Sequence, residues 1–192
     1  MMAERERHRV DAESKAAALA PAEPRGLHLS GEQRDTFDHV TGGKDLSIVV
    51  GYAGTGKSAM LGVAREAWEG AGYTVRGAAL SGIAAEGLEN GSGIHSRTIA
   101  SMEHGWAQGR DLLSSRDVLV IDEAGMVGTR QMERVLSHAA DAGAKVVLLA
   151  HFDRPKGKRV PEMSLAPMAA ALGQVLGKPV AFADDCVGAP AE

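Results

Sequence analysis

LSIVVGYAGTGKS, residues 46–58, decides the fold of this 192-residue chain. Its first five residues form a short apolar run that predicts a buried strand. The next eight match the spacing G-x-x-x-x-G-K-S in full, and helical periodicity follows over 57–69. A strand, a glycine-rich turn and a helix in this order predict a phosphate-binding loop. The alternative is a glycine turn made only for packing, and it gives the Gly-Lys-Ser sequence no purpose.

The chemistry of this loop suits a nucleotide and Mg²⁺. Glycines let successive backbone N–H groups point at one anion, and the following helix adds its positive end. The Lys57 ammonium can reach the β- and γ-phosphates, and the Ser58 hydroxyl can hold Mg²⁺. We therefore predict MgATP binding by these residues: Gly51, Ala53, Gly54, Thr55, Gly56, Lys57 and Ser58.

A second acidic site follows another apolar run, DVLVIDE at residues 117–123. Asp122 is predicted to hold Mg²⁺ through a water molecule, opposite Ser58. Glu123 is predicted to act as the general base on the attacking water, so Glu123 and Lys57 are the catalytic candidates. The alternative is a pair of solvated carboxylates at the end of a strand, which the upstream phosphate loop disfavours.

The rest of the chain alternates apolar runs with helical patterns. Strands are expected at 73–80, 118–121 and 145–149, and helices at 81–88, 98–106 and 129–142. A last helix at 164–176 and strand at 179–182 continue the alternation. This order predicts an α/β fold with a parallel sheet flanked by helices.

Composition excludes several classes of protein. The net charge is −4 and only 4% of residues are aromatic, which argues against a basic DNA-binding surface or a base-stacking platform. No apolar run reaches the roughly 18–20 residues of a membrane helix. Cys186 is the single cysteine and the histidines show no zinc spacing, so we expect a cytoplasmic protein without a membrane or metal-cluster partner.

The residues before the loop carry two weaker signals. Residues 1–26 balance their charges and end in prolines, which predicts a solvated helix and linker rather than a core element. Ser30 and Gln33 have the spacing of a capping box at a helix start, and Gly42-Gly43 closes that helix. Gln33 could instead hydrogen-bond an adenine edge, and the sequence leaves these two roles open.

Together with these motifs, the sequence of residues 27–148 resembles the first motor lobe of RecD-like superfamily 1 helicases, as found in conjugative transfer relaxases of the Ti-plasmid type. The resemblance rests on five stretches: 29–33, GYAGTGKSAM at 51–60, 81–88, 96–101 and 120–127. It implies a RecA-like P-loop ATPase with Gln33 at the adenine. It also implies that 81–88 and Thr98-Ile99 line a path for single-stranded DNA.

This resemblance stops after the strand at 145–149. The helicase family continues with Gly-Asp-x-x-Gln, whereas this chain reads Ala150-His151-Phe152-Asp153-Arg154 and has no equivalent glutamine. About 40 residues remain, which is too few for a second motor lobe with its arginine finger. We therefore expect slow hydrolysis, weak DNA binding and no unwinding.

Residues from about 144 to 192 resemble instead the N-terminal domain of phosphoglycerate kinase. The stretches that carry this likeness are 146–158, 161–167, 176–182 and 184–188. The resemblance implies that His151 and Arg154 contact 3-phosphoglycerate, and a planar guanidinium suits such an anion. The family's other substrate residues and its nucleotide domain are missing, so kinase activity is not expected.

The sequence thus predicts a chimera of two gene fragments joined within 142–149, where both families have a buried strand. The expected division is 1–26 as helix and linker, 27–149 as the ATPase lobe and 150–192 as the kinase-like fragment. Three functions stay open: an ATP-binding motor lobe, a phosphoglycerate kinase and a non-catalytic remnant. A recombination product, a pseudogene-like remnant and an assembly artefact would all leave the same sequence.

Overall fold

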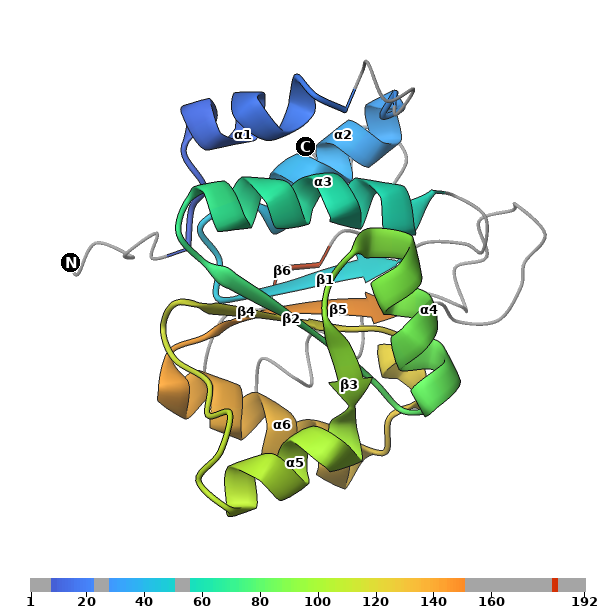
Figure 1. Ribbon diagram of the computed structural model, residues 1–192, viewed down its shortest axis with the longest axis vertical. Coiled ribbons are helices and arrows are strands. Elements are labelled where there is room, and N and C mark those ends of the chain that lie inside the picture. Colours follow the sequence, from blue (N-terminus) through green and yellow to red (C-terminus); the bar gives the residue numbers. More distant parts are fainter. Residues whose placement is uncertain (1–7, 23–27, 51–55, 151–180, 183–192) are drawn as a thin grey trace.

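The computed structural model describes residues 8–22, 28–50, 56–150 and 181–182. Its centre is a parallel sheet in the order β3-β2-β4-β5-β1-β6 (Figure 1). The strands are β1 (Leu46–Val50), β2 (Thr74–Ala79), β3 (Ser96–Thr98), β4 (Asp117–Ile121), β5 (Lys145–Ala150) and β6 (Ala181–Phe182). The predicted α/β class with a parallel sheet is therefore confirmed.

Helices cover both faces of this sheet. On one face lie α1 (Ala12–Leu19), α2 (Gly31–Val40) and α3 (Lys57–Gly70), with α4 (Gly82–Ser92) packed against α3 and β2. On the other face lie α5 (Ile99–Ala107) and α6 (Thr129–Ala142), and the short 3-10 turn η1 (Ala124–Met126) follows β4. Figure 1 shows the two helical layers above and below the strands.

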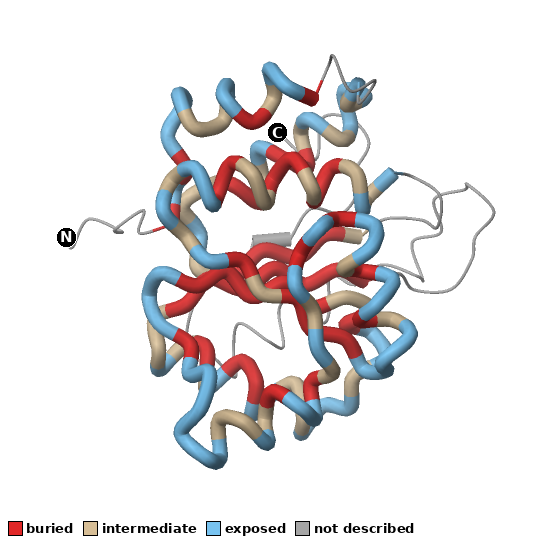
Figure 2. The backbone as a smooth tube through the Cα atoms, viewed as in Figure 1, coloured by how far each residue is buried: buried red, intermediate tan, exposed pale blue. Residues whose placement is uncertain are grey.

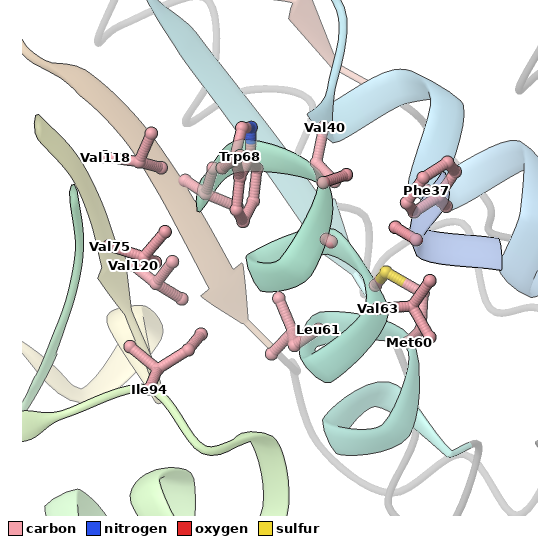
Figure 3. Packing of buried hydrophobic residues seen from close by; sticks show 14 of the residues in the cluster. Phe37, Val40, Met60, Leu61, Val63, Trp68, Val75, Ile94, Val118 and Val120 are labelled. Carbon is pink, nitrogen blue, oxygen red and sulfur yellow. The ribbon is translucent and has the colours of Figure 1, made fainter. Parts of the chain in front are cut away.

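The central strands are buried on both sides, which explains their unbroken apolar sequences. Successive side chains of a strand point to opposite faces. Val118 and Val120 of β4 accordingly belong to the core under α3, whereas Leu119 and Ile121 belong to the core under α5 and α6. Trp68 of α3 is fully buried in the first core, beside Val118 in Figure 3.

The N-terminal segment departs from its prediction. The helix is present as α1, but Val10, Ala18 and Ala22 are buried in the core that α3 shares with the sheet (Figure 2). Lys15 Nζ also lies 2.7 Å from Asp38 Oδ1 of α2. The expectation that residues 1–26 contribute no core element is wrong for the described part, because Ala18 of α1 and the flanking residues Val10 and Ala22 pack into the core.

The strands at the two edges of the sheet differ in part from their predictions. No strand was predicted at Ser96–Thr98, and the helix was expected to begin at Thr98. These three residues form the short edge strand β3 beside β2, and α5 begins at Ile99. At the other edge, β6 falls inside the predicted strand 179–182 and pairs with β1, with Ile48 level with Phe182. The predicted helix at 164–176 lies outside the described residues.

Candidate nucleotide site

The site lies at the edge of the sheet where the parallel strands end. Strand β5 separates β1 from β4, and the register places Val50 level with Ala150 and Ile121 level with Leu148. Val50 at the end of β1 and Ile121 at the end of β4 therefore lie at the same edge of the sheet, about 10 Å apart across two strand spacings. That separation suits two sets of ligands facing one metal–phosphate group from opposite sides.

Gly56 and Lys57 begin the helix that follows the loop. Gly56 is the N-cap of α3 in the left-handed conformation, with φ of 71°, which glycine adopts without the penalty of a Cβ. Lys57 and Ser58 are the first two helical residues, where backbone N–H groups have no partner within the helix. The predicted site residues Gly51, Ala53, Gly54 and Thr55 lie outside the described residues.

Gln33 shows both a capping role and a contact with the loop. Ser30 Oγ accepts a hydrogen bond from the Gln33 N–H at 3.3 Å, and Gln33 Oε1 accepts one from the Ser30 N–H at 3.0 Å. The other end of the amide faces Gly56, because a Cβ added to Gly56 would lie 2.3 Å from Gln33 Nε2. The capping box is thus present, and it leaves Gln33 beside the loop, where the adenine contact stays a prediction.

Asp122 and Glu123 occupy a tight turn directly after β4. The Asp122 N–H donates to the carbonyl oxygen of Ala78 on β2 at 2.9 Å, which extends the sheet by one residue. Asp122 Oδ1 then accepts the N–H of Glu123 at 2.8 Å. Glu123 has φ of 51° and ψ of 37°, a left-handed conformation that costs a non-glycine residue on the order of 1–3 kcal/mol. Both side chains are half-buried.

These two acidic residues and Ser58 offer only hydroxyl and carboxylate oxygens, the ligands that Mg²⁺ prefers. Within the described ranges, no group of three or more His, Cys, Asp or Glu side chains is placed to hold a metal ion by itself. A magnesium ion here would need the phosphates of a nucleotide as further ligands. The residues therefore fit Mg²⁺ bound together with a nucleotide.

The two segments assigned to a DNA path begin helices near the same edge. Ser81 caps α4 by accepting the Ala84 N–H at 3.2 Å, and Thr98 caps α5 by accepting the Ser101 N–H at 3.2 Å. Ile83 on the first turn of α4 is 86% exposed. The start of the first segment, 81–83, is exposed, whereas Ile99 of the second segment is buried, and contact with DNA stays a prediction.

Two further predictions fall elsewhere. His151 and Arg154, the 3-phosphoglycerate candidates, lie outside the described residues. In the part of the chain that is described, no helix is long and apolar enough to cross a membrane.

One neighbour of the site was not predicted, namely Gly91 of α4. A Cβ added at Gly91 would clash with the Ser58 side chain. The helix predicted over 81–88 ends before Gly91, so no signal in the sequence marked this glycine as an interior helical residue.

Comparison with known protein families supports the predicted P-loop ATPase class. The sequence profile of the AAA domain matches residues 28–153, more than half of the chain. The chain belongs to the AAA domain family. This family assignment implies nucleotide binding.

Two conjugal transfer proteins match this AAA domain chain. The conjugal transfer protein TraA of Rhizobium radiobacter is 53% identical over 121 residues, which are 63% of this chain and 11% of that protein. A probable conjugal transfer protein TraA of Sinorhizobium fredii is 47% identical over 148 residues, 77% of this chain and 13% of that protein. The chain thus spans about a tenth of the length of these curated relatives.

The remainder of the chain matches a different family. The profile of phosphoglycerate kinase covers residues 126–192. The phosphoglycerate kinase of Caulobacter vibrioides is 76% identical over 49 residues, 26% of this chain and 12% of that enzyme. The two resemblances predicted from the sequence are therefore confirmed, and different parts of the chain carry them. The two profiles overlap over 126–153, which includes α6 and β5.

Proposed function

We propose that this chain is an MgATP-binding P-loop ATPase lobe of the conjugal transfer type, with slow hydrolysis and no unwinding of DNA on its own. The observation that carries the proposal is that two groups of candidate residues lie at the same edge of the sheet. Gly56, in the left-handed conformation, precedes α3, which begins at Lys57. Asp122 and Glu123 follow β4 at that edge. The proposed location is the cytoplasm, where ATP is available.

Each residue has a proposed part in the reaction. Lys57 and the first N–H groups of α3 bind the β- and γ-phosphates, and Gln33 contacts the adenine through the amide end that faces Gly56. Ser58 and Asp122 hold Mg²⁺, which when bound offsets phosphate charge. Glu123 takes a proton from water as the water oxygen bonds to the γ-phosphorus and the bond to ADP breaks.

Slow hydrolysis is expected because these residues include no arginine to stabilise the negative charge that develops on the γ-phosphate. Negative charge on the γ-phosphate in the transition state is commonly stabilised by an arginine from outside the lobe, worth roughly 10³–10⁵-fold in rate. None of the described site residues Gln33, Gly56, Lys57, Ser58, Asp122 and Glu123 is an arginine. Single-stranded DNA is proposed as a weak partner of 81–88 and Thr98-Ile99.

The first test is thermal unfolding of the purified chain with and without MgATP. A ligand that binds only the folded state raises the melting temperature, and 100-fold saturation stabilises by about 2.7 kcal/mol. We expect a clear upward shift that Lys57→Ala abolishes, because the ammonium is the cation at the phosphates. The exposed Lys44→Ala variant serves as the matched control and should keep the shift.

Other results would contradict the proposal in different ways. A cooperative melt without any shift would mean that the sheet folds but binds no nucleotide, and no cooperative melt would favour a non-catalytic remnant. Phosphoglycerate kinase activity makes its own prediction, namely 3-phosphoglycerate-dependent turnover in a coupled assay that Arg154→Ala removes. Detection of that turnover would replace the ATPase proposal.

A further inference from the structure

Helix α4 approaches helix α3 closely at Gly91. A Cβ added to Gly91 would lie 2.8 Å from Ser58 Cβ and 2.9 Å from Ser58 Oγ, closer than real Cβ contacts. At Gly82 and Gly87 of the same helix, an added Cβ would meet nothing within 4 Å. Gly91 therefore differs from its neighbouring glycines in facing the residue proposed to hold Mg²⁺.

The backbone conformation does not explain this glycine. Gly91 lies inside α4 and is not among the described residues with positive φ. Glycine at an ordinary helical position is less stable than alanine by about 1 kcal/mol. The close approach to Ser58 is the feature that an alanine at this position would disturb.

Helix α4 is also held in place around Gly91, so the two helices cannot move apart easily. Leu88 is buried in the core under α3, and Arg65 Nε of α3 donates to the Ser92 carbonyl oxygen at 3.3 Å. On the facing helix, a Cβ at Gly62 would lie 3.4 Å from that same oxygen. A methyl group at position 91 would consequently press on the Ser58 side chain rather than shift α4.

We propose that Gly91 is a positioning residue of the nucleotide site, which leaves the Ser58 hydroxyl the room to act as a magnesium ligand. This inference rests on the proposed function, because it assigns Ser58 to Mg²⁺. It predicts that Gly91→Ala weakens the magnesium dependence of ATP binding while nucleotide binding without magnesium persists. Changes to groups that orient a metal ligand typically cost roughly 10–100-fold in metal affinity.

The experiment measures ATP binding by the full chain at increasing Mg²⁺ concentrations, and again with a chelator. Gly91→Ala is expected to need roughly 10–100-fold more Mg²⁺ for half-maximal effect, with ATP affinity in chelator near that of the wild type. The matched control is Gly105→Ala inside α5, where the nearest atom to the added Cβ is at an ordinary 3.6 Å. That control should keep the wild-type magnesium dependence.

A double variant tests whether Gly91 acts through Ser58. In a Ser58→Ala background the hydroxyl ligand is already gone, so Gly91→Ala should add little further loss of magnesium dependence. Equal magnesium dependence in Gly91→Ala and Gly105→Ala would overturn the proposal. A full additional loss in the Ser58→Ala background would overturn it as well, since Gly91 would then act elsewhere.

Folding of the variant provides a second readout that needs no ligand. If Gly91→Ala melts without cooperativity, the added Ser58→Gly change removes the Cβ that the methyl strikes and should restore a cooperative melt. Failure of that restoration would show that the methyl does not press on Ser58. If the wild type itself is not stabilised by MgATP, the proposed function fails and the metal role falls with it, whereas the restoration test still decides the contact.

Discussion

Replacing Glu123 by glutamine should slow ATP hydrolysis by about 10²–10⁴-fold and leave MgATP binding nearly unchanged. The reason is that glutamine keeps the size and hydrogen-bonding capacity of the side chain but cannot take a proton from water, and a positioned general base contributes a factor of that order. The measurement is single-turnover release of phosphate, with the MgATP thermal shift recorded on the same samples. Loss of the thermal shift would instead make Glu123 a binding residue.

The matched control for this substitution is Glu133→Gln. Glu133 is exposed on α6, and the change removes the same charge from a residue outside the proposed site. Phosphate release should match that of the wild type. If Glu123→Gln and Glu133→Gln hydrolyse ATP equally fast, the general base is another residue and the assignment of Glu123 is wrong.

The backbone of Glu123 adds a second result at the same position. With φ of 51°, this residue occupies a conformation that glycine adopts freely. Glu123→Gly should therefore leave the chain as stable as Glu123→Ala or more so, by roughly 1 kcal/mol in urea unfolding, although neither variant retains a base. A less stable glycine variant would mean that the side chain contributes contacts that outweigh the backbone strain.

The ends of the strands and helices that carry the candidate site residues could be predicted from the sequence, whereas the packing around them could not. Asp122 and Glu123 could be placed beside the phosphate loop because carboxyl ends of parallel strands share one edge, and an apolar strand precedes each element. The partner of Gly91 could not be predicted, because Ser58 lies on another helix and a missing side chain leaves no pattern. The contacts of the N-terminal segment with the core could not be predicted for a similar reason, because Ala18 of α1 and Ala22 beyond it give little apolar signal among charged residues.

The junction between the two families is understandable from the alternation along β5. Val147 and Leu149 face the core under α3, whereas Val146 and Leu148 face the core under α5 and α6. A strand buried on both faces requires only an unbroken apolar run in the correct register, and many unrelated strands supply that. Strand β6, from the kinase-like part, then covers the edge of β1, which would otherwise offer unpaired backbone groups.

A buried lysine at the start of β5 makes the stability of the chain depend on alkaline pH. Lys145 is fully buried, and its Nζ donates to the carbonyl oxygens of Gly42, at 3.1 Å, and Lys44. Burial lowers the pKa of Lys145 from 10.5 to about 8, opposed by the charge of Asp45. The pKa of His39 is also lowered, first by its own burial and then by the charge of Lys145.

The sign of the pH effect follows from which state binds more protons. Between pH 8 and 10.5 the unfolded chain keeps the Lys145 proton that the folded chain has lost, so the free energy of unfolding rises with pH. Below pH 8 both states are protonated, and the cost of the buried charge is constant at about 3 kcal/mol. Above pH 10.5 that cost is gone.

Lys145→Met should remove this dependence. Methionine fills a similar volume without a charge, but it leaves two carbonyl oxygens without this donor, at about 1–3 kcal/mol each. Near neutral pH, removal of the buried charge stabilises the variant and loss of the hydrogen-bond donor destabilises it. The stability of the variant at neutral pH is therefore not the test. The decisive quantity is the free energy of unfolding of the wild type minus that of the variant, which should grow by about 3 kcal/mol from pH 8 to 10.5.

Urea unfolding of both chains across this pH range measures that difference, and other titrating groups cancel in the subtraction. Lys44→Met is the matched control, because Lys44 is exposed and its backbone carbonyl remains available to Lys145. The control should follow the wild-type pH dependence. A flat difference between the wild type and Lys145→Met would mean that Lys145 keeps its proton in the folded chain, held by the carbonyl oxygens more strongly than burial disfavours its charge.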